Sequence, residues 1–434
     1  MVPSKNILLL SFLYFVQGIP YGLQSRFLPV YLRSSGMSLT NLTFFKLLLI
    51  PWLCKALWAP FIDKYGTKRE WLIWSMAGLA MTCAFASYLS QAELIALSIL
   101  LFLLNCFTAT QDIAVDSIAI QILSSNQLGQ GNTAQVVGYK FGAIIGGGVL
   151  LWLVDIIGLK LLFTMLTLIY FLSVLFVFSS QSLKDASAFT KANSNAGQTE
   201  KDSGMQEMKV LQVQDMSYFG ILRDVLKPQG TKWLLGFVLI YKLGEQGALS
   251  SFPLYMVDQN VSSADIGFWV GVLGQITSIF GSALAGFLLS KCHVAAHSFL
   301  QHLFLLQLIP LTSMFLLVSF WRPSFFFLGV ICMNALLIIS GLVTTTTFTF
   351  MMQCSQHAPV QIQGTHYTTL ATLEVFGKLT FASLLGLLID LFGYKSMYLF
   401  FIFMSVVINP YLKQCPNFLK EIHELNTKSD NKSR

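Results

Sequence analysis

Charged residues are scarce in this sequence. Only 11% of its 434 residues are Asp, Glu, Lys or Arg, whereas an average soluble domain carries about 25%. Apolar residues make up 55% of the chain, and a water-soluble protein of this size has too little polar surface to cover so many of them. We therefore expect an integral membrane protein whose apolar side chains face lipid.

Motifs for catalysis, metal binding and nucleotide binding are also lacking. The seven cysteines are scattered, without the CxxC or Cys/His spacing of a zinc site or a disulfide framework. No phosphate-binding glycine loop or hydrolase nucleophile elbow occurs, and no basic stripe interleaved with aromatics indicates a nucleic-acid partner. We expect no enzyme activity, no cofactor and no metal site. Energy for any transport would then come from an ion gradient or from the gradient of the solute itself.

Twelve apolar stretches are long enough to cross a membrane as helices, which takes about 20 residues each. Six precede a polar linker at residues 181–231 and six follow it. They cover residues 7–31, 40–62, 71–90, 94–122, 133–155 and 159–180, and then 232–257, 264–290, 298–320, 323–352, 364–392 and 395–412. We expect an all-α membrane protein with one bundle in residues 1–180, a second in 232–412, and a polar tail at 413–434.

The positions of lysine and arginine predict which side of the membrane each loop faces. If the N-terminus is cytoplasmic, the inner segments carry 17 of the 27 basic residues and the outer loops carry four. Because positive charge is retained on the cytoplasmic side, we expect both termini, the linker and the tail in the cytoplasm.

Glycine and proline interrupt two spans that occupy corresponding positions in the two sets. These residues are Gly18, Pro20 and Gly22 in the first span, and Gly244, Gly247 and Pro253 in the seventh. In a transporter such paired interruptions point to the substrate path. Small residues also let neighbouring helices pack closely. The sequence leaves both interpretations open.

Four basic and four acidic residues lie deep inside the predicted spans, where each needs a partner or water. They are Lys55, Lys140, Lys242, Lys378, Asp112, Asp116, Glu245 and Glu374. Asp112 and Asp116 are four residues apart, so they share one helix face with Cβ atoms roughly 6 Å apart. Two carboxylates that close resist joint ionisation, so one holds a proton unless a lysine intervenes. We expect either a proton-coupling pair or a structural network neutralised by Lys55 or Lys140.

Two further charge pairs are spaced for contact along one helix. Glu374 and Lys378 have the favourable order for an ion pair, and we interpret them as structural. Lys242 and Glu245 are three residues apart, beside the glycines of the seventh span. That place is nearer a predicted cavity, so Lys242 and Glu245 are candidates for a substrate site as well as for a structural pair.

Several short stretches resemble the motifs of one group of transporters. Residues 59–69 are similar to the loop pattern G-x-x-x-D-R/K-x-G-R-R/K of the major facilitator superfamily, with departures at Ala59 and Thr67. Residues 55–63 resemble K-x-x-W-A/S-P-x-x-D, found in acetyl-coenzyme A carriers and muropeptide permeases of that superfamily. The carriers' A-T-Q-D-I-A-V-D is similar to residues 109–116, and the permeases' Y-K-L-G-D/E to residues 241–245.

This resemblance implies a major facilitator fold, with twelve helices in two six-helix bundles that give alternating access to an anionic, acyl-bearing solute. The expected solute is acetyl-coenzyme A or similar, carried with protons by a monomer in the lipid bilayer. The site residues then have the following expected roles. Proton coupling falls to Asp112 and Asp116, substrate binding to Lys140, Lys242, Glu245, Gln17 and Gln111, and conformational control to Asp63, Lys68, Arg69 and Lys55.

Two departures keep alternatives open. The loop at residues 90–93 is short, whereas the acetyl-coenzyme A carriers have a long insertion there, and Glu245 matches the permeases. The second hypothesis is therefore a permease for a muropeptide-like or other organic anion. A third, of another class, is a non-transporting membrane scaffold or sensor, whose deep charges would be paired away from water.

Overall fold

The fold is given by a computed structural model that describes residues 5–24, 28, 48–89, 93–124, 127–184, 220, 223–261, 263–266, 268–269, 273–291, 294–417 and 419. Within these residues the ordered secondary structure is helical, and no strand occurs. Most of the predicted linker at 181–231 and of the predicted tail at 413–434 lies outside the described residues.

The helices of the first half fall on the first six apolar stretches. They are α1 (Lys5–Gly22), α4 (Ile50–Lys64), α5 (Lys68–Ala86), α6 (Leu94–Ile122), α7 (Leu128–Ile144), the π-helix η3 (Ile145–Val149) and α8 (Leu150–Ser179). The fifth stretch comprises α7, η3 and the start of α8. Helix α8 turns at Gly158 and continues as the sixth stretch.

The helices of the second half follow the same plan. They are α11 (Thr231–Ile240), α12 (Leu243–Asp258), α13 (Ser263–Ile266), α14 (Leu273–Lys291), α15 (Ala296–Leu306), α16 (Leu308–Ser319), the 3-10 helix η7 (Pro323–Phe325), α17 (Phe326–Gln356), η8 (Val360–Ile362) and α18 (Gln363–Lys413). Helix α18 contains the eleventh and twelfth stretches. In the described part of the chain, six helical segments are by themselves long and apolar enough to cross a membrane.

An internal repeat is visible where each half ends. Gly158 in α8 has φ +77° and ψ 163°, and Gly393 in α18 has φ +75° and ψ 159°. Positive φ is readily adopted by glycine and strained for other residues. Residues 155–160 and 390–395 both read D-x-x-G-x-K. The same glycine turn therefore reverses the chain between the last two spans of each half.

Two compact units make up the chain, and each contains a short segment from the other half. Unit 1 consists of Met1–Leu123, Val137–Lys227 and Ser355–Thr372, and unit 2 of Ser124–Val136, Pro228–Cys354 and Leu373–Arg434. The exchanged segments contain the start of α7 and the start of α18. These two helix starts hold corresponding places in the repeat.

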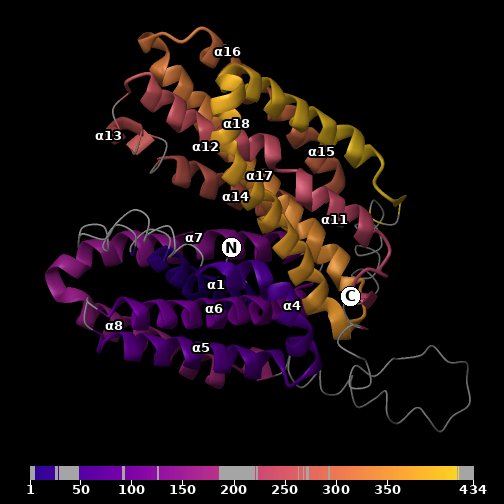
Figure 1. Cartoon of the computed structure of the whole chain (residues 1–434). Coiled ribbons are helices and arrows are strands. Elements are labelled where there is room, and N and C mark those ends of the chain that lie inside the picture. The colour runs from indigo at the N-terminus through magenta and orange to yellow at the C-terminus, as the bar shows by residue number, and fades with distance from the viewer. Residues whose placement is uncertain are drawn as a thin grey trace, which may run out of the picture. The chain divides into compact units, whose positions relative to one another are not determined.

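In unit 1, α5 packs against both α6 and α8, while α1 and α4 pack against α6. Figure 1 shows α1, α6 and α5 running alongside one another in the indigo and violet part of the chain. Ala59 and Ile62 of α4 are fully buried against Ile113 of α6, with Trp58 and Trp71 packed around them. The loop resembling the family motif therefore begins on a helix fixed against α6.

Helix α1 approaches α7 and η3 so closely that glycine is required at the crossing. A Cβ on Gly18 would lie 2.1 Å from the carbonyl oxygen of Tyr139, and a Cβ on Gly142 would lie 2.0 Å from that of Phe15. Helix α1 stays helical through Pro20. In the first span, the close-packing interpretation of the glycines accounts for the geometry.

The seventh span is broken in the structure. Helix α11 ends at Ile240, Tyr241 and Lys242 form a turn, and α12 begins at Leu243. Close packing also occurs here, because a Cβ on Gly244 would lie 2.4 Å from the carbonyl oxygen of Phe401. The interruption predicted for this span therefore exists, two to three residues before its first glycine.

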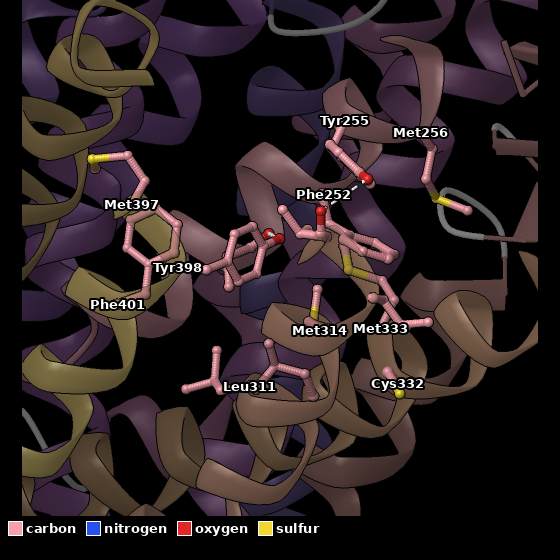
Figure 2. Packing of buried hydrophobic residues seen from close by; sticks show 14 of the residues in the cluster. Phe252, Tyr255, Met256, Leu311, Met314, Cys332, Met333, Met397, Tyr398 and Phe401 are labelled. Carbon is pink, nitrogen blue, oxygen red and sulfur yellow. Dashed lines mark hydrogen bonds between the residues drawn. The ribbon is translucent and has the colours of Figure 1, made fainter. Parts of the chain in front are cut away.

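Unit 2 has a buried core rich in aromatic and methionine side chains. Figure 2 shows this core, to which α12, α16, α17 and α18 contribute; its members include Phe252, Met314, Met333, Tyr398 and Phe401. All five are at most 2% exposed. Because side chains of this size bury much apolar area, this cluster fixes α12, the helix that follows the broken segment, against α18.

Candidate functional site

The centre of unit 1 holds a buried ion pair between α4 and α6. Lys55 of α4 contacts Oδ2 of Asp112 on α6, and the side-chain amide of Gln17 on α1 donates a hydrogen bond to Oδ1. Both charged side chains are less than a tenth exposed. Of the two lysines considered as partners from the sequence, the structure places Lys55 on Asp112. Lys140 lies half-buried on α7.

Asp116 has a different partner. The hydroxyl of Tyr14 on α1 donates to Oδ1 of Asp116 at 2.8 Å, and Asp116 is 2% exposed. Tyr14 was not among the residues singled out from the sequence. It lies three residues before Gln17, so the two share a face of α1, and that spacing was the available signal. The two carboxylates of α6 are therefore distinguished by what touches them.

A third set of contacts extends this polar interface toward the other end of α1. Trp52 Nε1 donates to Asn105 Oδ1 at 3.1 Å, and the Asn105 amide donates to Gln24 Oε1. The Trp52 ring lies 5.6 Å from Lys55 Nζ. We call the α1–α6 set the polar seam; it consists of Tyr14, Gln17, Gln24, Asn105, Asp112 and Asp116. All six side chains are at most 6% exposed.

Gln111 is a buried polar side chain next to the seam in sequence. It is fully buried, and neither of its amide atoms has a hydrogen-bond partner among the described residues. Leaving a buried polar group unpaired costs about 1–3 kcal/mol, so such a group is a candidate for a ligand or water contact. Its expected role in substrate binding stays a proposal.

Unit 2 contains a second charge cluster, centred on Glu374 of α18. Lys378 Nζ lies 2.7 Å from Glu374 Oε2, and the Tyr241 hydroxyl donates to Oε1 at 2.8 Å. Both carboxylate oxygens thus have close partners. Tyr241 stands at the break between α11 and α12, directly before the lysine that the sequence had singled out.

Lys242 and Glu245 lie beside this cluster but do not form a close ion pair. Lys242 Nζ donates to Thr344 Oγ1 on α17, and its distance to Glu245 Oε1 is 3.8 Å. Neither carboxylate oxygen of Glu245 has a hydrogen-bond partner in the described chain, and Glu245 is 1% exposed. The broken helix therefore carries a buried acid that has a lysine 3.8 Å away but no hydrogen bond among the described residues.

Asp63, at the end of α4, binds the start of α18 within unit 1. Its Oδ2 accepts hydrogen bonds from the backbone N–H and the hydroxyl of Thr365, each at 2.6 Å, and its Oδ1 contacts Lys68. The first N–H groups of a helix lack intrahelical partners and attract anions. A Cβ on Gly364 would lie 2.6 Å from Oδ1, so glycine is needed there. We call this contact the Asp63 joint.

The remaining residues of that loop have local roles. Arg69 donates to the carbonyl of Phe178 at 2.7 Å and lies over its ring at 5.3 Å. Thr67, one of the departures from the family pattern, caps α5, since its hydroxyl accepts from the N–H of Glu70 and its own N–H donates to the Glu70 carboxylate. Threonine at this position is explained by the helix cap.

Unit 2 has an equivalent of the Asp63 joint that the sequence interpretation missed. Ser290, one residue before the end of α14, accepts a hydrogen bond from the backbone N–H of Gln130 at 3.1 Å. Gln130 is the third residue of α7, as Thr365 is the third residue of α18. A Cβ on Gly129 would lie 2.8 Å from Ser290 Oγ. We call this contact the Ser290 joint; its signal in the sequence is weak because an uncharged serine replaces the aspartate.

The chemistry available in these clusters is that of protons and buried ion pairs. In the part of the chain that is described, no group of three His, Cys, Asp or Glu side chains is placed to hold a metal ion. The acids differ instead in the donors and cations around them, which is the arrangement that separates the protonation behaviour of like groups.

Comparison with known proteins identifies the family. Residues 10–370 match the sequence profile of the Major Facilitator Superfamily. The anhydromuropeptide permease of Escherichia coli K12 is 22% identical over 418 residues, which cover 93% of this chain and 78% of the permease.

Solved structures agree in fold. The transporter FucP, a member of the same superfamily in an outward conformation, has a TM-score of 0.70 at 13% identity, covering 95% of this chain and 99% of FucP. The human organic anion transporter MFSD10 has a TM-score of 0.62 at 15% identity, covering 95% of this chain and 100% of that one. The protein is an integral, multi-pass membrane protein with the all-α major facilitator fold, and it belongs to the major facilitator superfamily of transporters.

Proposed function

We propose that this protein is a secondary active transporter that moves an organic anion by proton-coupled alternating access. The observation that carries the proposal is the unequal environment of the two carboxylates on α6. Asp112 contacts the Lys55 ammonium group, whereas Asp116 is bound by the neutral hydroxyl of Tyr14. We propose that Asp112 stays ionised in this ion pair and that Asp116 is the acid that exchanges a proton.

Tyr14 suits this exchange chemically. A phenol hydroxyl both donates and accepts hydrogen bonds. It donates to Asp116 when the carboxylate is ionised, and it accepts from Asp116 when the acid is protonated. Both protonation states keep a partner in a buried place, so neither leaves an unpaired polar group. We assign the coupling proton to Asp116, with Asp112 and Lys55 as the fixed charges beside it.

The solute is proposed to be an anion that is attracted by lysine and amide side chains of the membrane spans. Lys140 and Lys242 supply positive charge, and Gln17, Gln111 and Glu245 supply polar contacts. The motif at residues 109–116 favours acetyl-coenzyme A or a similar acyl-bearing anion. Similarity to the E. coli anhydromuropeptide permease over most of both chains favours a muropeptide-like anion as the second candidate.

Conformational control is assigned to the Asp63 joint. It fastens the start of α18 to the end of α4 through two hydrogen bonds to one charged oxygen. Bonds to a charged acceptor are roughly twice as strong as neutral ones. We propose that closing and opening this joint, on the side predicted to be cytoplasmic, separates two access states. Lys68 and Arg69 hold the loop in place.

The test is uptake by purified protein in proteoliposomes, with labelled acetyl-coenzyme A as solute and anhydromuropeptide as competitor. Uptake should rise when the outside is made acidic. Asp116→Asn should abolish this acceleration while leaving solute counterflow, which needs no net proton movement. Asp224→Asn is the matched control, because Asp224 pairs with the exposed Lys227 away from the polar seam.

The outcomes separate the hypotheses. Unchanged pH dependence in a folded Asp116→Asn variant overturns the proton role. If unlabelled anhydromuropeptide inhibits uptake more strongly than unlabelled acetyl-coenzyme A does, the proposed solute becomes a muropeptide-like anion. Absence of any transport or counterflow with both anions favours the scaffold or sensor.

A further inference from the structure

Glu245 is placed unusually for an acidic residue. It lies in the first turn of α12, directly after the break at Tyr241 and Lys242, and only 1% of it is exposed. The free N–H groups of a first helical turn commonly donate to a carboxylate. Here neither carboxylate oxygen of Glu245 has a hydrogen-bond partner among the described residues. The helix start therefore does not stabilise it as an anion.

The charged groups around Glu245 come from the α11–α12 break and from α18, and none of them lies within hydrogen-bond distance of its carboxylate. Lys242 is the nearest cation, at 3.8 Å, and its ammonium group is hydrogen-bonded to Thr344 of α17. From α18, Lys378 is engaged by Glu374, which also receives the Tyr241 hydroxyl. Both lysines of the cluster thus have other partners.

The neutral groups near Glu245 do not supply a hydrogen bond to its carboxylate either. Ser340 of α17 lies near enough to interact with Glu245, yet no hydrogen bond of ordinary geometry reaches either oxygen. An ionised carboxylate that is buried without hydrogen bonds is very costly, and such a group neutralises instead. A protonated carboxyl is uncharged and can itself donate a hydrogen bond. The geometry fits the protonated acid better than the anion.

We infer that Glu245 is a second proton-binding site of this transporter, so that each unit contains one exchanging carboxyl, Asp116 in unit 1 and Glu245 in unit 2. Uptake of the proton converts hydronium to water and the carboxylate to the acid, and release reverses this on the other side of the membrane. This inference rests on the proposed transport function and adds to it.

The test uses infrared spectroscopy of the purified full-length protein in nanodiscs, because protonated carboxyl groups have a carbonyl stretch that disappears on ionisation. The sample is titrated from acidic to alkaline pH without any solute. We expect two buried carboxyl bands in the wild type. Glu245→Gln should remove one of them, about half of the buried carboxyl absorbance, and Asp116→Asn should remove the other.

Glu374→Gln is the matched control. It is the same substitution in the same unit, but Glu374 is ion-paired with Lys378. It should leave both bands in place. If Glu245→Gln leaves the spectrum of the wild type unchanged, the inference is wrong. If instead Asp116→Asn has no effect while Glu245→Gln removes a band, the inference stands and the proton role of Asp116 fails.

A second variant keeps the test valid if Glu245→Gln does not fold. Glu245→Asp retains a carboxyl group but shortens the side chain by one methylene. Its band should persist at a shifted frequency and titrate over a different pH range, while the Asp116 band stays in place. An unshifted pair of bands in Glu245→Asp would contradict the inference.

Discussion

The two units are built on the same backbone plan but pair their polar groups differently. Unit 1 pairs its lysine, Lys55, with a carboxylate, whereas unit 2 directs Lys242 to the hydroxyl of Thr344. Unit 1 holds the start of α18 with Asp63, and unit 2 holds the start of α7 with Ser290. An internal repeat can thus keep its helix geometry while an ionic contact of one half corresponds to a contact with a neutral hydroxyl in the other.

This difference predicts unequal contributions to stability. Charged contacts buried in unit 1 should be costly to break singly, because each leaves an unpaired charge. The equivalent contacts of unit 2 involve neutral partners and should cost less. Each of the following comparisons can be measured by thermal unfolding of detergent-purified variants.

The largest effect is expected at Lys55. Lys55→Met leaves Asp112 as a buried carboxylate without its cation, and breaking a buried pair in this way costs about 3–5 kcal/mol. Lys242→Met should cost clearly less, since Glu245 Oε1 is 3.8 Å from the Lys242 nitrogen, beyond hydrogen-bond distance. Adding Asp112→Asn to Lys55→Met should recover most of the loss. Equal losses of stability in Lys55→Met and Lys242→Met would contradict the predicted difference between the two units.

Glycine crossings give the next largest effect. Gly142→Ala forces a methyl group to within 2.0 Å of the Phe15 carbonyl oxygen, and Gly377→Ala to within 2.5 Å of that of Leu239. Overpacking of this kind typically costs about 1–3 kcal/mol, with the higher value for Gly142. Gly148→Ala is the control, because no atom of the described residues lies within 4 Å of its added methyl. A stable Gly142→Ala variant would mean that α1 can move away from α7 freely.

The two joints should differ by about a factor of two. Asp63→Asn weakens hydrogen bonds to a charged acceptor and its contact with Lys68, at about 1.5–3 kcal/mol. Ser290→Ala removes one neutral bond, at about 0.5–1.5 kcal/mol. Ser290→Asp would make the second joint resemble the first and should raise the unfolding temperature. A larger loss for Ser290→Ala than for Asp63→Asn would reverse the assignment of the stronger joint.

Removing a tyrosine hydroxyl should have the smallest effect. Tyr14→Phe and Tyr241→Phe each delete one hydrogen bond to a carboxyl group, at about 1 kcal/mol. Tyr241→Phe should cost less, because Glu374 keeps Lys378 as a partner. Tyr14→Phe should also slow the acid-driven uptake of labelled acetyl-coenzyme A, and Tyr241→Phe should not. Equal uptake by the two variants would argue against a role of Tyr14 in proton exchange.

How far the candidate site could be predicted depends on sequence distance. Asp112 with Asp116 and Glu374 with Lys378 were found because each pair lies on one helix, where spacing gives proximity. The choice of Lys55 over Lys140 as the partner of Asp112 was not predictable, since it depends on how α4 and α7 pack against α6. Ser290 was missed for a related reason: serine carries no charge that marks a joint.

By itself the sequence determined that this chain is a helical, multi-pass membrane protein with two matching halves. A membrane span requires about 20 consecutive apolar residues. The spans can therefore be recognised from the local sequence alone. Only the tertiary structure decided that Lys55 contacts Asp112, that the Tyr14 hydroxyl donates to Asp116, and that Glu245 is buried without a hydrogen bond among the described residues. Those outcomes depend on side chains brought together from distant helices, and a change of a few ångströms in helix packing alters them.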